Sequence, residues 1–311
     1  MRPLPQGGAA RPDRGGDRLK GALKLAAAPI TWGISEVPGW GRQLDAGRVL
    51  SEIARAGLVA TELGPQGFLP EDPATLEARL AAHGLALVGG FVPAVLHRPK
   101  ILDEELARVE AGARTLASAG AEVLVLAARA PESGYDAARA PTPAEWESLA
   151  RGIAATLEIG RTHGLVVAVH PHVGTLIERE PEIRRLLEST AASLCLDTGH
   201  LTVAGVDPLR VARAAAGRIA HVHLKDVDGA LAARVRTGDL GYHEAVRRGL
   251  YRPLGQGDVD VAAVVEILRA QGYDGWYVLE QDLVIEDEGD RGIPLENALQ
   301  SVRFLSRWMA A

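Results

Sequence analysis

Cysteine and long apolar runs are both scarce in this sequence of 311 residues. Its single cysteine, Cys195, cannot form an intramolecular disulfide and lies in an apolar run, where a buried thiol behaves as a small hydrophobic group. No apolar run approaches the ~20 residues needed to cross a bilayer, and the N-terminus lacks the charged-then-apolar order of a secretory signal. We therefore expect a soluble protein of the reducing cytoplasm, with no membrane partner.

The sequence also lacks an excess of basic residues. Its 34 Lys and Arg against 40 Asp and Glu give a formal net charge of -6, which provides no overall basic field for a polyanion. This balance argues against a nucleic-acid partner and favours a small molecule. Hydrophobic residues make up 47% of the chain and charged residues 24%, so the chain can bury a large core.

Apolar periodicity divides the chain into two parts. Residues 1–22 are rich in Gly, Pro, Arg and Asp without such periodicity, so we expect a flexible N-terminal tail. Residues 23–311 contain eight continuous apolar runs, each followed by a helical pattern, as expected for parallel strands that are buried on both faces. The predicted strands are 25–31, 59–63, 86–91, 122–127, 166–170, 193–197, 219–224 and 276–280. The predicted helices are 45–56, 73–83, 103–119, 143–163, 181–189, 208–216, 260–271 and 294–309.

These eight repeats predict an α/β fold of one domain, a (β/α)8 or TIM barrel, whose active site is built from the loops that follow the strands. The alternative is an open doubly wound sheet, in which a glycine-rich first turn binds a dinucleotide, and Gly39-Trp40-Gly41 is a weak partial match to that turn. The longest connection, residues 226–259, is an insert that we expect to act as a lid or as a contact in a homo-oligomer.

Polar side chains gather at the ends of four consecutive predicted strands. Five of the nine histidines fall between residues 170 and 223. In a parallel barrel these strand ends are neighbours around one mouth, so imidazole and carboxylate groups converge. An Asx turn or a pair of packed imidazoles explains any one segment, but the recurrence on four strands predicts a metal site. The segments are His170-Pro171-His172, Asp197-Thr198-Gly199-His200, His221-Val222-His223-Leu224-Lys225-Asp226 and Glu280-Gln281-Asp282.

The alternation of side chains along a strand selects the residues that can reach the ion. His221 and His223 share a face, and His223 lies nearer the mouth, so we assign His223 as a ligand and His221 to the layer beneath. A mixed set of imidazoles and carboxylates suits one Mn²⁺ or Co²⁺ ion, with Zn²⁺ or Fe²⁺ as further choices, better than Ca²⁺. The predicted metal ligands are His170, Asp197, His223 and Glu280.

Several residues near the predicted mouth have either a structural or a functional explanation. Lys225 forms a surface ion pair or neutralises an oxyanion, and Glu62 points to solvent or to the mouth. Trp32, like Trp40, packs a loop or covers the apolar face of a sugar-like ring. Two loop histidines, His97 and His200, lie close enough to the mouth to contact a ligand. Three further histidines are expected at the surface: His83, His163 and His243.

At these residues the chain resembles the xylose isomerase-like barrels, a superfamily of sugar isomerases, epimerases and endonuclease IV. These enzymes place Glu, Asp, His and Glu around a metal on strands five to eight, and His170 stands at the position of the first Glu. The resemblance is closest to the inosose dehydratase family and covers about residues 25 to 308. The matching segments are the His-rich fifth strand with Gly174-Thr175, and residues 28–33, 62–65, 196–201, 221–226 and 280–282.

This resemblance implies dehydration of 2-keto-myo-inositol, or inosose, to a trihydroxycyclohexane-1,2-dione. Elimination begins with loss of an α-proton, and a divalent ion at the ketone oxygen and a neighbouring hydroxyl stabilises the enediolate. His172 is the first candidate for the base and Glu62 the second. Lys225 would stabilise the oxyanion, and His200 would protonate the departing hydroxyl.

Other functions use the same barrel. A ketose isomerase or epimerase would reprotonate the enediolate instead of releasing hydroxide. Hydrolysis of abasic DNA needs further metal ligands and a basic face, which the acidic balance disfavours. A non-catalytic carbohydrate-binding barrel is the alternative from another class, and only an assay of turnover distinguishes it.

Overall fold

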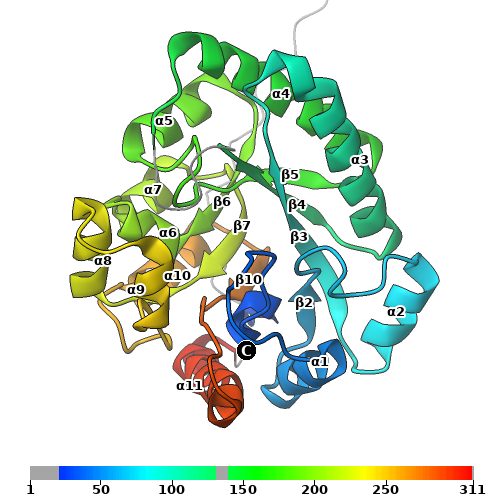
Figure 1. The fold of residues 1–311 in the computed structure, drawn as a ribbon, viewed down its shortest axis with the longest axis vertical. Helices are drawn as coiled ribbons and strands as arrows, with labels where there is room; N and C mark the ends of the chain where they lie inside the picture. Colours follow the sequence, from blue (N-terminus) through cyan, green and yellow to red (C-terminus); the bar gives the residue numbers. More distant parts are fainter. Residues whose placement is uncertain (1–20, 131–138, 310–311) are drawn as a thin grey trace, which may run out of the picture.

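Residues 21–130 and 139–309 are described by the computed structural model of the chain. Their barrel strands are all parallel and close in the order β1-β10-β7-β6-β5-β4-β3-β2, with the helices outside them (Figure 1). The predicted barrel is confirmed, and the open doubly wound sheet is excluded. Most of the predicted tail, residues 1–20, lies outside the described residues. The barrel strands are β1 Lys24–Ala27, β2 Ala60–Glu62, β3 Ala86–Ala94, β4 Val123–Ala128, β5 Val166–Val169, β6 Ser193–Asp197, β7 Ile219–Leu224 and β10 Trp276–Leu279.

Helices connect successive strands and cover the outside of the barrel. Five of these helices are followed closely by a glycine with φ between 66° and 83°, the left-handed region that glycine adopts without strain: Gly57, Gly84, Gly120, Gly164 and Gly272. A short additional helix directly follows β6. The outer helices are α1 Ala46–Arg55, α2 Pro73–Ala81, α3 Leu102–Ser118, α4 Pro143–Thr162, α5 Glu180–Ser189, α6 Thr198–Val203, α7 Pro208–Ala214, α10 Val261–Ala270 and α11 Ile293–Leu305.

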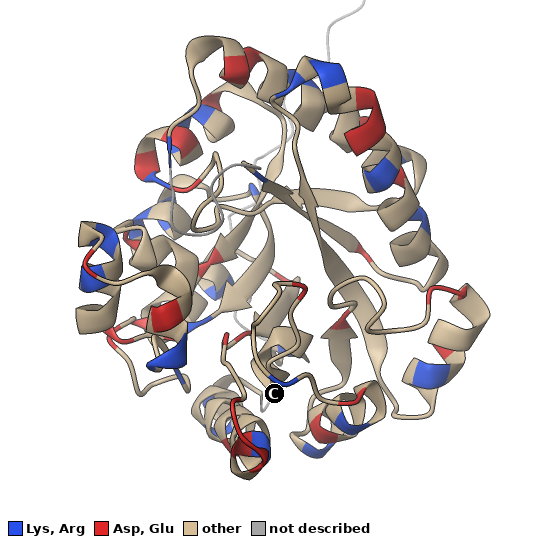
Figure 2. Ribbon diagram, in the orientation of Figure 1, with Lys and Arg blue, Asp and Glu red and all other residues tan. Residues whose placement is uncertain are grey.

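The surface carries mixed charge. Lys and Arg residues alternate with Asp and Glu residues along the ribbons of the outer helices (Figure 2). Over the described ranges 21–130 and 139–309, no helix is both long enough and apolar enough to cross a membrane. Inside the barrel, all six residues of β4 are buried, as the continuous apolar run predicted.

The insert at residues 226–259 folds as a small unit beside α6. Its ends, β8 Asp226–Val227 and β9 Tyr251–Arg252, pair with each other in antiparallel orientation. Between them lie α8 Gly229–Thr237 and α9 Tyr242–Arg247, which appear together at the edge of the barrel in Figure 1. The insert therefore has secondary structure of its own, and its apolar side chains share one cluster with Trp40, Val173 and Val203 outside it. Its buried apolar residues include Val227, Ala232, Leu240, Tyr242, Ala245, Val246, Leu250 and Tyr251.

The first strand is shorter than predicted. It ends at Ala27, and residues Pro29–Trp32 form a 3-10 turn instead of continuing the strand. Proline has no N–H to donate to a neighbouring strand and its φ is fixed, so the ladder stops before Pro29. This early stop changes the direction in which Trp32 points.

Candidate metal centre and active site

Four neighbouring strands bring the predicted metal ligands together at one end of the barrel. Asp197 and His223 are partners in the β6–β7 register, His170 directly follows β5, and Glu280 directly follows β10. All four are buried, with exposed fractions from 0% for Asp197 to 9% for Glu280. The positions thus agree with the predicted centre, and their role as ligands stays a prediction.

The donor atoms of these residues are separated by distances suited to one ion. Asp197 Oδ2 lies 3.2 Å from His170 Nε2 and 3.4 Å from His223 Nδ1. His223 Nδ1 lies 2.9 Å from Glu280 Oε2. Ligand bonds of ~2.0–2.2 Å place adjacent donors of a coordination shell roughly 3 Å apart. The residues present therefore fit a divalent ion with nitrogen and oxygen ligands.

Glu62 lies beneath this centre rather than beside it. Its Oε1 accepts hydrogen bonds from His221 Nε2 at 2.8 Å and from His223 Nε2 at 3.0 Å. Burial would raise the pKa of Glu62, but the two histidines hold it far below its ordinary value. The carboxylate thus fixes the ring of His223 from below and leaves Nδ1 facing the other donors, which is the usual arrangement around a metal-binding histidine.

Lys225 places an ammonium group among the carboxylates. Its Nζ lies 3.3 Å from Asp197 Oδ2, 2.9 Å from Glu280 Oε2 and 3.1 Å from Asp282 Oδ1. Burial would lower the pKa of Lys225, but these carboxylates raise it well above its ordinary value. The lysine is 2% exposed, so the surface ion pair considered from the sequence is wrong.

The rings of His172 and His200 lie against each other beside the centre, tilted by 36°. Their ring centroids are 3.7 Å apart. The Nδ1–H of His172 donates to the carbonyl of Val173 at 2.7 Å, so the lone pair of the neutral ring is on Nε2. Burial, with the nearby charges of His170 and Lys225, lowers the pKa of His172 to about 3. Burial likewise lowers the pKa of His200, whose Nε2 lies 3.0 Å from Lys225 Nζ. Both imidazoles are therefore neutral near pH 7.

The structure does not bring Trp32 or His97 to the centre. Trp32 is fully buried, and its indole N–H donates to Glu52 Oε2 at 2.9 Å, so it packs α1 against the barrel instead of contacting a ligand. His97 is 3% exposed, and its Nε2 lies 4.0 Å from Glu145 Oε1 in the first turn of α4. Trp40 is also buried and stacks on His243, at 4.8 Å between ring centroids, so His243 belongs to a packed pair.

Sequence reasoning missed several residues around the centre. Phe91 of β3 lies beside the two histidines that follow β5, with ring centroids 6.0 Å from His170 and 5.7 Å from His172. Tyr242 and Tyr251 reach the site from the insert, where no periodic pattern marks them. Asp282 is visible in the sequence, two residues after Glu280 in the Glu-Gln-Asp segment. This spacing is the signal that points to a shared side of the chain.

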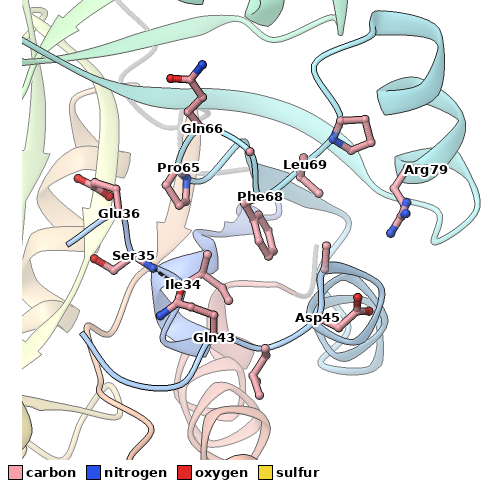
Figure 3. A pocket seen from close by; sticks show the side chains of 14 residues that line it. Ile34, Ser35, Glu36, Gln43, Asp45, Pro65, Gln66, Phe68, Leu69 and Arg79 are labelled. Carbon is pink, nitrogen blue, oxygen red and sulfur yellow. Dashed lines mark hydrogen bonds between the residues drawn. The ribbon is translucent and has the colours of Figure 1, made fainter. Parts of the chain in front are cut away.

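An open cavity lies away from this centre. It has a volume of about 620 Å³ and is formed by the loops after β1 and β2 together with Arg79 of α2 (Figure 3). Asp45 and Glu36 contribute carboxylates to its wall, and Phe68 contributes an aromatic ring. None of the four predicted metal ligands lines this cavity.

Comparisons with known proteins agree with this geometry. A family model described as Xylose isomerase-like TIM barrel matches residues 50–308. An inosose dehydratase of Geobacillus kaustophilus is 33% identical over 271 residues, which cover 84% of this chain and 87% of that protein. The rhizopine catabolism protein MocC of Rhizobium meliloti is 33% identical over 299 residues, covering 93% of this chain and 90% of that protein.

Solved structures share the fold at lower identity. One described as the IOLI protein with a binding zinc atom has a TM-score of 0.69 and 15% identity, and the match covers 93% of this chain and 100% of that chain. This likeness concerns the barrel alone, whereas the sequence matches extend to the family. The chain belongs to the inosose dehydratase family of xylose isomerase-like TIM barrels.

Proposed function

We propose that this protein is a metal-dependent hydro-lyase that removes water from 2-keto-myo-inositol. One observation carries the proposal: the predicted metal ligands share a barrel mouth with the ammonium of Lys225 and with two neutral imidazoles, His172 and His200. The relationship to an inosose dehydratase at 33% identity supports a small polyhydroxylated ketone as the substrate.

His170, Asp197, His223 and Glu280 would hold one divalent ion. When bound, such an ion supplies positive charge beside the ketone oxygen, which makes the neighbouring C–H bond more acidic. The mixed donor set favours Mn²⁺ or Co²⁺, with Zn²⁺ and Fe²⁺ as the other choices. Elemental analysis should find one ion per chain, and Asp197→Ala and Glu280→Ala should lose it. Full metal occupancy in either variant contradicts the ligand set.

Proton transfer would use the two adjacent histidines, His172 and His200. Nε2 of His172 takes the α-proton, because this ring is neutral and its lone pair is on that nitrogen. His200 gives a proton to the departing hydroxyl, and Lys225 Nζ, 3.0 Å away, replaces that proton. The C–H and C–O bonds break, a C=C bond forms and water leaves, and return of the proton from His172 through the adjacent His200 to Lys225 restores the starting charges.

The test is turnover of inosose by the metal-loaded protein in deuterated water. A dehydratase should form a product that absorbs as a conjugated enol or dione. An isomerase or epimerase would exchange the α-hydrogen but keep the oxygen, and a binding protein would do neither. Ready isomerisation of a ketose without elimination from inosose would overturn the proposal.

Two variants separate the proton transfers. His172→Ala should abolish both α-hydrogen exchange and product, because the first proton is never removed. His200→Ala should keep the exchange and lose the elimination. If both variants exchange and eliminate at the wild-type rate, the two assignments are wrong.

A further inference from the structure

Two tyrosine hydroxyls of the insert at residues 226–259 are connected to Lys225 through the carboxylate of Asp282. The hydroxyl of Tyr251 lies 3.0 Å from that of Tyr242, which donates to Asp282 Oδ2 at 3.0 Å. The other oxygen of Asp282, Oδ1, lies 3.1 Å from Lys225 Nζ. Tyr242 is 1% exposed, Tyr251 is 2% exposed and Asp282 is 7% exposed, so water does not replace these partners easily.

The charges around Lys225 assign a distinct role to Asp282. Three carboxylates surround the ammonium, and two of them, Asp197 and Glu280, are predicted metal ligands. A divalent ion bound there would balance the charge of those two. Asp282 is then the counter-charge that Lys225 keeps, and a buried ammonium without one is strongly unfavourable.

Close packing holds the stem of Lys225 in the same place. Its Nζ lies 5.3 Å from the ring centroid of Tyr251. At Gly199, a Cβ atom would lie 2.5 Å from Lys225 Cβ and 2.8 Å from Tyr251 Cε1, closer than real Cβ contacts. Glycine at position 199 thus allows the side chain of Lys225 to pack against Tyr251 of the insert. This packing directs the ammonium towards Asp282.

We propose that Asp282, held by Tyr242 of the insert, is the counter-ion that fixes the Lys225 ammonium beside the metal centre. Asp282 and Tyr242 are then positioning residues for the reaction. This inference rests on the proposed function for its turnover experiment but not for its metal titrations. It gives the insert a part in the chemistry, and the lid or oligomer contact expected from the sequence stays a prediction.

Titration with Mn²⁺ alone, without substrate, tests the pairing. In Asp282→Asn the ammonium has lost its own counter-charge and repels the ion, so Mn²⁺ affinity should fall about tenfold. Lys225→Met should bind Mn²⁺ at least as tightly as the wild-type protein. The double variant should regain the affinity of Lys225→Met, because neither charge is then left unpaired.

The double variant also distinguishes Asp282 as the counter-ion of Lys225 from Asp282 as a metal ligand. If Asp282 were itself a metal ligand, the double variant would bind Mn²⁺ as weakly as Asp282→Asn, and this result would overturn the proposal. Unchanged affinity in Asp282→Asn would overturn it as well. If Asp282→Asn does not fold, charge pairing predicts that the double variant folds and binds Mn²⁺, and its failure to do so contradicts the proposal.

Turnover tests the part played by Tyr242. Tyr242→Phe keeps the ring and removes the hydroxyl, so kcat for inosose should fall about tenfold, with KM and Mn²⁺ affinity little changed. Because Tyr242 acts through Asp282, adding Tyr242→Phe to Asp282→Asn should cause no further loss. If the losses in kcat of Tyr242→Phe and Asp282→Asn multiply in the double variant, or if kcat of Tyr242→Phe is unchanged, Tyr242 does not have this role.

Tyr273→Phe is the matched control. Its hydroxyl also makes one hydrogen bond, to the carbonyl of Trp276 at 2.8 Å, but at the opposite end of β10. Its kcat should equal that of the wild-type protein. If the wild-type protein does not dehydrate inosose, the proposed function fails, and the Mn²⁺ titrations still decide the pairing of Asp282 with Lys225.

Discussion

The two ring nitrogens of His223 face different parts of the barrel. Nε2 donates to Glu62 at 3.0 Å, whereas Nδ1 lies 2.9 Å from Glu280 and 3.4 Å from Asp197. A carboxylate that accepts the second N–H of a metal-binding imidazole fixes both its tautomer and its orientation. Glu62, the second candidate for the base in the sequence, is therefore better placed to orient His223 than to take a proton from substrate.

Replacement of Glu62 should weaken metal binding without removing a ligand. In Glu62→Gln one carboxylate oxygen becomes an N–H donor and the negative charge facing His221 and His223 is lost, so metal affinity should fall about tenfold or more. Equilibrium dialysis with Mn²⁺ measures this change. Glu52→Gln is a suitable control, because Glu52 is equally buried but bonds to Trp32 and Arg48 outside the barrel mouth. Equal Mn²⁺ affinity in the two variants would show that Glu62 has no influence on the centre.

His97 should make the protein sensitive to acid. Burial, against the opposing charge of Glu145, lowers the pKa of His97 below its ordinary value of 6.5, so the unfolded chain takes up a proton here before the folded protein does. Its contribution to stability is complete above pH 6.5 and is lost as the pH falls towards the folded pKa. When the pH is lowered from about 7.5 to about 5.5, the melting temperature of His97→Phe should therefore fall by less than that of the wild-type protein. A larger loss in the variant would mean that His97 is charged in the folded protein.

At the scale of elements, the sequence predicts strand ends better than loops. The runs that form β5, β6 and β10 are mainly apolar and are closed by a polar residue at the mouth, and β7 alternates apolar residues with His221 and His223, so both the strands and the residues at the mouth could be identified. Trp32 was misplaced because Pro29 ends the first strand early. The tyrosines of the insert could not be placed, because α8 and α9 have only nine and six residues and their apolar groups pack in a cluster with Trp40, Val173 and Val203, which are distant in sequence.

One carboxylate at the start of the insert holds its two ends together. Asp226 Oδ1 accepts from the N–H groups of Val227 and Val259, at 2.9 and 3.0 Å. Its Oδ2 accepts from Gly255 and Gly257, at 2.8 and 2.9 Å. A Cβ at Gly257 would lie against Asp226 Oδ1, so only glycine permits this approach. The Gly-Gln-Gly-Asp segment at 255–258 is thus a binding loop for a carboxylate of the same chain.

Removal of that carboxylate should loosen the insert. Asp226→Ala leaves four backbone N–H groups without their acceptor, and at about 1–3 kcal/mol for each that stays unsatisfied, the free energy of unfolding should fall by about 3 kcal/mol or more. Asp226→Asn keeps one acceptor oxygen and should lose less. Urea unfolding measures both changes. Asp239→Asn, at an exposed carboxylate of the same insert, should have little effect, and equal losses at positions 226 and 239 would contradict this role of Asp226.

Across the whole molecule, the fold concentrates buried charge at one end of the barrel. Asp197, Glu280 and Asp282 are all within 3.3 Å of Lys225 Nζ, and the outer surface carries mixed charge (Figure 2). One ammonium cannot balance three carboxylates, and the repulsion that is left opposes folding. Binding of a divalent ion should relieve it, so stability and metal occupancy are expected to be coupled.

Metal removal should therefore lower the melting temperature. An ion that binds only the folded state stabilises it by about 2.7 kcal/mol at a concentration one hundred times its Kd, which for a chain of this size corresponds to a shift of roughly 5 °C. Differential scanning calorimetry with Mn²⁺ and with a chelator measures the difference. Asp197→Ala should show no shift on adding Mn²⁺, because Asp197 belongs both to the group with His170 and to the group with His223 and Glu280. Glu52→Gln should show the full shift, starting from a lower melting temperature without metal. A shift of equal size in Asp197→Ala would place the stabilising ion elsewhere on the molecule, and the predicted centre would then have no part in holding the fold together.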